Sequence, residues 1–398
     1  MKALESIRVL DLSQGISGPY CSKMMAAFGA KVIKVEPPGR GDWARHNGPF
    51  LQDRPDPETS ALFLYLNTGK KSITLGLEKP GAAGLLKRLI READVLVENF
   101  RPGYLSDLGL GYQSLRELRP GLVMASITDF GQSGPYRDFM GGRLPANALS
   151  GYMYVNGDPE REPLAGGGEQ AAYQGGLHAY TAIIAALIKR QKTGQGRYID
   201  VSILEGLTSL HQFTINRFVY SGKVQKRTGN RYLWSHPIAI YPCKDGQVSV
   251  GASTEDQAER LLTLMEMPHL LEDPRFETGF LRLEHAEAFD DLVRPWFRQR
   301  TKKEIVALCQ EWRVPAAPVN DVSDLLKDQQ YKARDYWVEM EHPKAGRLPY
   351  AGAPFKMSAT PAEYSRSPLL GEHNQEIYQG RLSLKQAEID LLSAEGTI

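Results

Sequence analysis

Two clusters of basic residues stand where ligands of α/β proteins often bind. Lys70 and Lys71 follow Asn67, and Arg101 lies within the run 98–103, in both cases after an apolar stretch. A turn at the end of a strand offers backbone N–H groups, and with a nearby Arg or Lys it suits a phosphate group. A solvated basic loop accounts for the same residues equally well. The sequence thus predicts either a site for a phosphorylated ligand or two exposed basic loops.

Other chemistries lack their motifs in this chain. No GxxxxGK[ST] loop is present, and Gly166-Gly167-Gly168 does not have the spacing of a dinucleotide-binding turn. The triplet Asp129-Phe130-Gly131 occurs without the other motifs of a protein kinase, so we interpret it as a coincidence. The eight histidines show no HExxH spacing. We therefore expect neither nucleotide-dependent redox chemistry nor a metal site.

Length and composition are those of an ordinary globular protein. The chain has 398 residues, of which 42% are hydrophobic and 24% are charged, enough for two or more cores. The net charge of +1 favours neither a nucleic acid nor an anionic membrane as a partner. Because no signal peptide and no apolar run of roughly 20 residues is found, we expect a cytoplasmic protein. Its three cysteines, Cys21, Cys243 and Cys309, are then expected to be reduced.

Apolar runs alternate with helical patterns in the N-terminal half. The patterns predict strands over 7–12, 30–35, 94–98, 122–127 and 198–202, and helices over 18–28, 81–92 and 177–190. Strands separated by helices indicate an α/β fold with a parallel sheet covered by helices. The Gly-rich region 131–176 is too irregular for a long element.

The pattern changes beyond residue 225. A predicted hairpin pairs 238–241 with 247–250, and charged amphipathic helices follow to about residue 330. This block is a candidate for a second, smaller α+β domain over 225–334. The remaining segment, 335–398, has short apolar stretches and Pro/Gly turns, which are typical of a tail that lies along another surface.

Short motifs are spread along nearly the whole chain. They lie at 7–12, 18–19, 28–36, 41–42, 67–73, 94–103, 131–136, 193–202, 352–355 and 368–373. In this order and spacing the chain resembles the class III CoA-transferase family, which includes the formyl-CoA and carnitine CoA-transferases. The resemblance implies a large Rossmann-like domain formed by 1–224 and the returning tail, a small domain between them, and two subunits threaded as interlocked rings. The tail would return to the large domain or wrap the partner.

The resemblance also implies coenzyme A or an acyl-CoA as the substrate, with no metal, and positions for it. The residues that match the CoA site of the family are Ile16, Ser17, Leu75, Asn99, Phe100 and Arg101, and we add Lys70 and Lys71 as candidate CoA-binding residues from the phosphate argument above. Ile16 and Ser17 would face the thioester arm, and Leu75 would lie near the adenine. Asp107 stands where related enzymes have an arginine, so part of the phosphate contact is altered.

The resemblance places the nucleophilic aspartate of the family one helical turn before a glycine that is Gly176 here, which puts Ala172 at its position. In these enzymes a carboxylate attacks the donor thioester, forms a mixed anhydride and then carries CoA as a thioester. Alanine cannot do this. Either Glu169 replaces the aspartate in a self-sufficient homodimer, or this chain is a silent CoA-binding subunit and a paralogous partner carries the aspartate.

A second departure favours the silent subunit. Gly142 and Arg143 stand where relatives carry Tyr or His followed by Asp, so several acidic and basic groups are lost together. An acyl-CoA racemase needs an acid and a base there, which disfavours that activity. Arg137 and Arg143 are candidates to bind the carboxylate of an acceptor acid, with surface ion pairs as the alternative role. We expect succinyl-CoA as the donor and an organic acid as the acceptor.

Overall fold

The computed structural model of the protein describes residues 2–398. The chain divides into two compact units. Unit 1 holds residues 1–152, 165–216 and 330–398, and unit 2 holds residues 153–164 and 217–329. The unit limits at 216/217 and 329/330 lie within ten residues of the predicted boundaries at 224/225 and 334/335. That the units are separate domains, and that two subunits interlock, stay predictions.

A six-stranded parallel sheet forms the centre of unit 1. Its strands are β1 (Arg8–Asp11), β2 (Lys31–Glu36), β3 (Lys71–Thr74), β4 (Val95–Glu98), β5 (Val123–Thr128) and β6 (Tyr198–Ser202). They are ordered β3-β2-β1-β4-β5-β6, and every neighbouring pair is parallel. The predicted α/β class is confirmed. Because the chain moves outward in both directions from β1 and β4, the carboxyl ends of these two strands flank the crevice where α/β sheets bind ligands.

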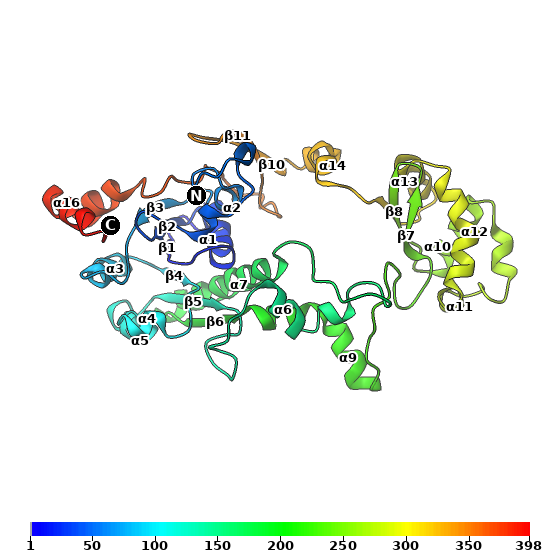
Figure 1. The fold of residues 1–398 in the computed structure, drawn as a ribbon, viewed down its shortest axis with the longest axis horizontal. Helices are drawn as coiled ribbons and strands as arrows, with labels where there is room; N and C mark the ends of the chain where they lie inside the picture. The colour runs from blue at the N-terminus through cyan, green and yellow to red at the C-terminus, as the bar shows by residue number, and fades with distance from the viewer. Residues whose placement is uncertain (1) are drawn as a thin grey trace. The chain divides into compact units, whose positions relative to one another are not determined.

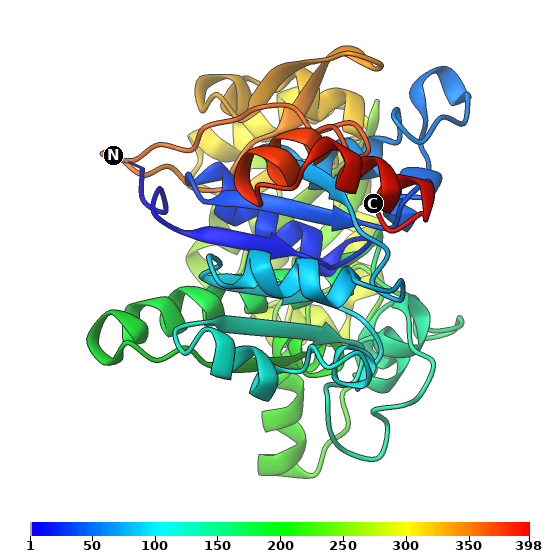
Figure 2. The same ribbon diagram turned by 90° about the vertical axis from the view of Figure 1, so that its left-hand side faces the viewer.

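Helices cover both faces of this sheet, since alternate residues of each strand point to opposite faces. Leu10, Leu96 and Met124 pack against α3 (Ala82–Ile90), α5 (Tyr112–Leu118) and α16 (Gln386–Ala394). Their neighbours Val9, Val95 and Val123 pack against α1 (Ser17–Ala27), α7 (Gln170–Thr193) and α8 (Ile203–Thr208). Figure 1 shows these two helical layers, and Figure 2 views the sheet from the side of α3 and the red helix α16.

Helix α7 differs from the sequence prediction, because it begins at Gln170 rather than near residue 177. Gly175 and Gly176 were interpreted as the end of an irregular region, yet both lie inside the helix. A Cβ on Gly176 would lie 2.4 Å from Ser17 O, so this glycine allows α7 to pack directly on α1, whereas a Cβ on Gly175 would lie 2.8 Å from Ile203 Cγ1 of α8. Tertiary packing thus outweighs the low helix propensity of glycine. The helix ends at Gly194, whose φ of 67° is left-handed, after Arg190 and Lys192 in its last turn.

The C-terminal tail packs on the edge strand β3. His373 N donates to Ser72 O at 2.9 Å, Thr74 N donates to Asn374 Oδ1 at 2.8 Å, and the Tyr378 hydroxyl donates to Thr74 O at 2.6 Å. Ile377 and Tyr378 belong to the same buried cluster as Leu10 and Ile33. The tail therefore covers an edge that would otherwise be open to pairing.

The other elements of unit 1 are short. They include the helices α2 (Ala61–Leu66), α4 (Tyr104–Asp107), α6 (Arg143–Leu149), η1 (Trp43–His46) and η6 (Glu376–Arg381), and the antiparallel strands β10 (Trp337–His342) and β11 (Gly346–Ala351). Helices α9 (Gln212–Ser221) and α15 (Gln329–Ala333) contain two of the four points at which the chain passes from one unit to the other.

Unit 2 contains an antiparallel sheet and helices of its own, with a separate core. The strands are β7 (Ile238–Cys243), β8 (Gly246–Gly251) and β9 (Ala316–Pro318), and β7 and β8 form the predicted hairpin. The helices are α10 (Glu255–Leu264), α11 (Gly279–Glu284), α12 (Ala286–Arg298) and α13 (Lys302–Glu311), and α14 (Val322–Lys327) follows. Within residues 2–398 no helix is both long and apolar enough to cross a membrane.

Candidate functional site

A pocket of about 700 Å³ opens at the carboxyl ends of β1, β4 and β5 in unit 1. The loop after β1 contributes Gln14, Ile16 and Ser17, and the loop after β4 contributes 99–102. The rest of the wall comes from residues 127–130 at the end of β5, residues 137–142 before α6, Arg143 and Ala146 of α6, the starts of α7 and α8, and Trp43. The pocket therefore lies at the switch point that the strand order predicts.

The side chain of Asn99 joins the loops on the two sides of the switch point. Its Oδ1 accepts from Gln14 N at 2.8 Å, and its Nδ2 donates to Gln14 O at 2.7 Å. The amide of Asn99 therefore uses its acceptor and its donor on the backbone of a single residue, Gln14, in the neighbouring loop. Asn99 thereby ties the loop after β4 to the loop after β1, and residues 99–102 line the pocket beside it.

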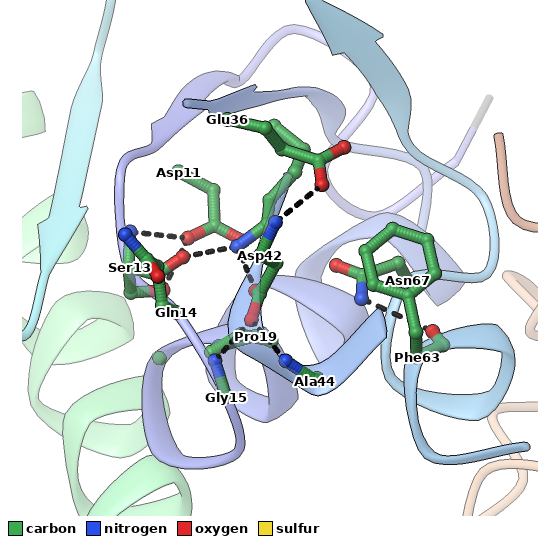
Figure 3. Close-up of polar contacts among 12 residues, drawn as sticks. Asp11, Ser13, Gln14, Gly15, Pro19, Glu36, Asp42, Ala44, Phe63 and Asn67 are labelled. Carbon is green, nitrogen blue, oxygen red and sulfur yellow. Dashed lines mark hydrogen bonds and ion pairs between the residues drawn. The ribbon is translucent and has the colours of Figure 1, made fainter. Parts of the chain in front are cut away.

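A buried charge network lies beneath the loop after β1, as Figure 3 shows in part. Asp11 is fully buried, and its carboxylate accepts from Lys70 Nζ at 2.9 Å and from the hydroxyls of Ser13 and Ser22. Burial alone would raise the pKa of Asp11, but Lys34 and Lys70 hold it at about 2. Lys70 also donates to Pro19 O and Asn67 Oδ1, both at 2.9 Å. All three donors of the Lys70 ammonium are thus used inside the protein, which indicates a structural role. Burial lowers the pKa of Lys70 to about 8.

The same network places an aromatic side chain at the pocket. Asp42 pairs with Lys34 at 2.7 Å, and its Oδ1 accepts from Gly15 N at 2.7 Å and from Ala44 N at 2.8 Å (Figure 3). Trp43, between these contacts, lines the pocket and is 41% exposed. A Cβ on Gly15 would lie 1.9 Å from Trp43 Cζ2, and the φ of Gly15 is +76°. Only glycine at position 15 leaves room for the indole and adopts this backbone conformation without strain.

A second buried acid stands under the loop after β4. Glu98 is 4% exposed, and its Oε2 accepts from Phe100 N at 2.8 Å. Burial raises its pKa from 4.5 to about 7, although hydrogen bonds from Ser126 and Phe100 oppose the rise. The folded protein therefore binds a proton at Glu98 more tightly than the unfolded chain does.

The pKa of Glu98 predicts a pH-dependent stability. Because the folded pKa is above the unfolded one, this contribution is present below about pH 4.5 and is lost as the pH rises to about 7. We expect Glu98→Gln to raise the free energy of unfolding at pH 8 by about 1–2 kcal/mol and to leave it unchanged at pH 4. Urea unfolding at pH 4, 6 and 8 checks this. An equal difference between the two proteins at every pH would contradict it.

The close approach of α1 and α7 places Ser17 and Ala172 on the wall of one pocket. Ser17 is the first residue of α1, and its carbonyl lies against Gly176, one turn after Ala172. Glu169 precedes α7 and also lines the pocket, with its side chain 44% exposed. At the position that the family resemblance gives to a nucleophile, the wall carries only a methyl group.

Arg143 begins α6 on the opposite side of the Gly-rich loop. Its Nη1 donates to Gly168 O at 3.1 Å and to Gly166 O at 3.3 Å, and its Nε lies 3.8 Å from Glu169 Oε1. An ion pair this long between half-exposed side chains contributes at most about 1 kcal/mol. Arg143 therefore orders the loop while its pairing with Glu169 stays weak.

The structure brings six of the nine predicted site residues to the pocket: Ile16, Ser17, Asn99, Phe100, Arg101 and Glu169. Arg101 is exposed and pairs with Asp107 at 3.1 Å, so the departure at Asp107 falls directly on the predicted phosphate contact. The other three, Lys70, Lys71 and Leu75, do not line the pocket. Lys71 is exposed and pairs with Glu376, and Leu75 is 2% exposed within the core.

Two kinds of pocket residue were missed at the level of the sequence. The first kind is Trp43. Its ring packs on Gly15 in the loop after β1, and no sequence motif pairs these two residues. Asp129 and Phe130 line the pocket at the end of β5. The triplet that contains them was considered only as a kinase motif, whereas its position after a predicted strand was the useful signal. Burial raises the pKa of Asp129, which accepts a hydrogen bond from the backbone of Gly142.

Known proteins resemble this arrangement over the whole chain. The model of the family described as CoA-transferase family III matches residues 4–374. The chain belongs to this family. The class III resemblance is thus confirmed, and the substrate of such a transferase is an acyl-CoA. No group of three or more His, Cys, Asp or Glu side chains within residues 2–398 is arranged to hold a metal ion.

Curated relatives and solved structures of this CoA-transferase family cover nearly its full length. The succinyl-CoA–D-citramalate CoA-transferase of Chloroflexus aurantiacus is 35% identical over 100% of this chain and 98% of its own. The beta subunit of the succinyl-CoA–L-malate CoA-transferase of the same organism is 34% identical over 99% and 98%. A CaiB/BaiF family protein from Brucella suis has a TM-score of 0.86 at 32% identity, with 95% of this chain and 99% of that chain covered.

Proposed function

We propose that this chain is the CoA-binding subunit of a class III CoA-transferase, in which a paralogous partner carries the nucleophilic aspartate. The transfer moves CoA from an acyl-CoA donor, with succinyl-CoA as our first candidate, to an organic acid. The observation that carries the proposal is Ala172, which lines the pocket where the family resemblance requires a carboxylate. One relative is named as a beta subunit, which supports a multi-subunit enzyme.

The chemistry explains why a methyl group there is decisive. A carboxylate oxygen must bond to the acyl carbon as the C–S bond breaks. The CoA thiolate must then attack the enzyme carbonyl of the resulting anhydride, which releases the donor acid and leaves CoA on the enzyme as a thioester. The acceptor acid repeats this exchange in reverse. Alanine can take part in none of these steps, so the pocket of this chain can bind substrate without transferring it.

The CoA site of the proposal uses the loops on the two sides of the switch point. Ile16 and Ser17 would border the thioester arm, and Asn99, Phe100 and Arg101 would border the nucleotide. Arg101 supports this assignment, since it is exposed and its pairing with Asp107 is a surface contact. We also propose that two subunits interlock, which the return of 330–398 to the N-terminal unit supports.

Glu169 gives a second candidate, a self-sufficient homodimeric transferase. Its carboxylate lines the same pocket as Ala172, lies in the last residue before α7 and is half exposed. The weak pair with Arg143 would not prevent its movement. This candidate differs from the first in one measurable respect: the chain alone would turn over.

The purified chain alone is expected to bind CoA but to show no transfer from succinyl-CoA to a panel of organic acids. Hydroxylamine, which traps acyl and CoA esters of carboxylates, should leave no adduct on the chain, as read by mass spectrometry of its peptides. Activity that disappears in Glu169→Gln but not in Glu117→Gln, an exposed glutamate of α5, would instead establish the second candidate. Co-purification from the native host then identifies the partner.

A further inference from the structure

Arg143 of the pocket has hydrogen-bonding capacity that the protein does not use. Arg143 donates only through Nη1 to the carbonyls of Gly166 and Gly168, at 3.3 and 3.1 Å. Within residues 2–398 its Nη2 makes no hydrogen bond, and its Nε has only the 3.8 Å contact with Glu169. The edge of the guanidinium formed by Nε and Nη2 is therefore free to receive a planar anion.

The backbone on both sides holds Arg143 in place. Asp129 accepts from the backbone of Gly142, and a Cβ on Gly141 would lie 2.3 Å from Asp129 Oδ2, so the turn before Arg143 is packed against the end of β5. On the other side, Asn147 Nδ2 donates to Arg143 O at 2.8 Å, and Asn147 Oδ1 accepts from Gly166 N at 3.3 Å. Asn147 is only 3% exposed. These contacts fix the residue before any ligand arrives.

Part of the pocket wall is made of small residues. Ala146, Ala171 and Ala172 line the pocket together with Gly141 and Gly142. The other two arginines of the pocket have acidic neighbours, since Arg101 lies 3.1 Å from Asp107 and Arg137 lies 3.3 Å from Asp138. Arg143 has the longest of the three ion-pair contacts. If a ligand carboxylate displaced Glu169 from Arg143, the protein would lose only a weak ion pair. The ligand would gain a bidentate contact with the guanidinium.

We propose that Arg143 binds the carboxylate of a free organic acid beside Ala172, in the same pocket as the thioester arm of CoA. This inference rests on the proposed function only for the presence of CoA in the rest of the pocket. The binding is noncovalent, so no bond forms or breaks. A carboxylate from the ligand then occupies the space in which active relatives would hold a carboxylate of their own.

Isothermal titration of succinate into the full chain, with and without saturating CoA, tests the proposal. Succinate should bind the wild type, and Arg143→Gln should weaken it at least about tenfold, since a charge-assisted bidentate contact is lost. Arg143→Lys should recover part of the affinity. Glu169→Gln should strengthen succinate binding about two- to fivefold, because the competing carboxylate is removed. Arg116→Gln, on the exposed face of α5, is the matched control.

The outcomes separate this inference from the proposed function. Absence of succinate binding to the wild type, or equal affinity in Arg143→Gln, overturns the inference even if CoA binds normally. If succinate binding is lost in Arg137→Gln and kept in Arg143→Gln, the carboxylate is bound by Arg137, and the inference is also overturned. Failure of CoA to bind overturns the proposed function, while titration of succinate into the CoA-free chain still tests Arg143.

Discussion

Replacing Lys70 with alanine is expected to lower the free energy of unfolding by about 3–5 kcal/mol, the loss typical of a broken buried ion pair. Lys70 and Asp11 are both fully buried at the side chain and lie 2.9 Å apart. Lys34 and Asp42 form a second such pair at 2.7 Å, so these four charges sum to zero. Removal of Lys70 leaves one negative charge in the core without its partner. Chemical denaturation followed by circular dichroism measures the loss.

The next residue supplies the control. Lys71 is the first residue of β3, directly after Lys70. Its side chain is 46% exposed, and that of its partner Glu376 is 52% exposed. Surface pairs of this kind contribute little, so Lys71→Ala should change stability by less than about 1 kcal/mol. Equal losses in the two variants would show that the buried network is not what stabilises the N-terminal unit.

Replacing Gly176 with alanine is expected to destabilise the protein by about 3 kcal/mol, at the upper end of the range for overpacking. The added Cβ would lie 2.4 Å from Ser17 O and 3.2 Å from Tyr20 Cδ1. The nearer contact is a backbone atom, so α1 itself must move. Because Ser17 begins α1 and lines the pocket, the shift should also weaken CoA binding by about tenfold or more. Unfolding in urea and CoA titration measure the two effects.

Gly84 provides the opposite result in a matched substitution. It lies inside α3, and no atom lies within 4 Å of a Cβ built on it. Gly84→Ala should therefore stabilise the protein by about 0.5–1 kcal/mol, through helix propensity alone, and should leave CoA binding unchanged. If both substitutions stabilise the protein, the close packing of α1 on α7 does not limit what residue 176 can be.

Much of the fold could be predicted from residue patterns, because the strands of the parallel sheet are apolar runs bounded by polar turns. β1, β2, β4, β5 and β6 all lie within or close to their predicted ranges. β3 was missed, since 71–74 is short and begins with a lysine that faces solvent. The start of α7 was missed because Gly175 and Gly176 look like helix breakers unless the helix that packs on them is known.

The candidate site was less predictable, for a physical reason. Motif position can place a residue near a pocket, as with Ile16 and Phe100, but it does not say where the side chain points. Lys70 and Lys71 have the same charge and adjacent positions, yet one is buried in a salt-bridge network and the other is on the surface. Trp43 and Asp129 reach the pocket through long-range packing on Gly15 and Gly141, which leaves almost no local trace.

The tail on β3 has a consequence for how the chain is made. The hydrogen bond from Tyr378 to Thr74 joins residues 304 positions apart. At roughly 5–20 residues per second of synthesis, β3 leaves the ribosome about 15–60 s before the segment that covers its edge. During that interval the backbone groups of Ser72 and Thr74 have no tail to pair with. The N-terminal strands must therefore remain soluble with an open edge until residues 373–378 have been added.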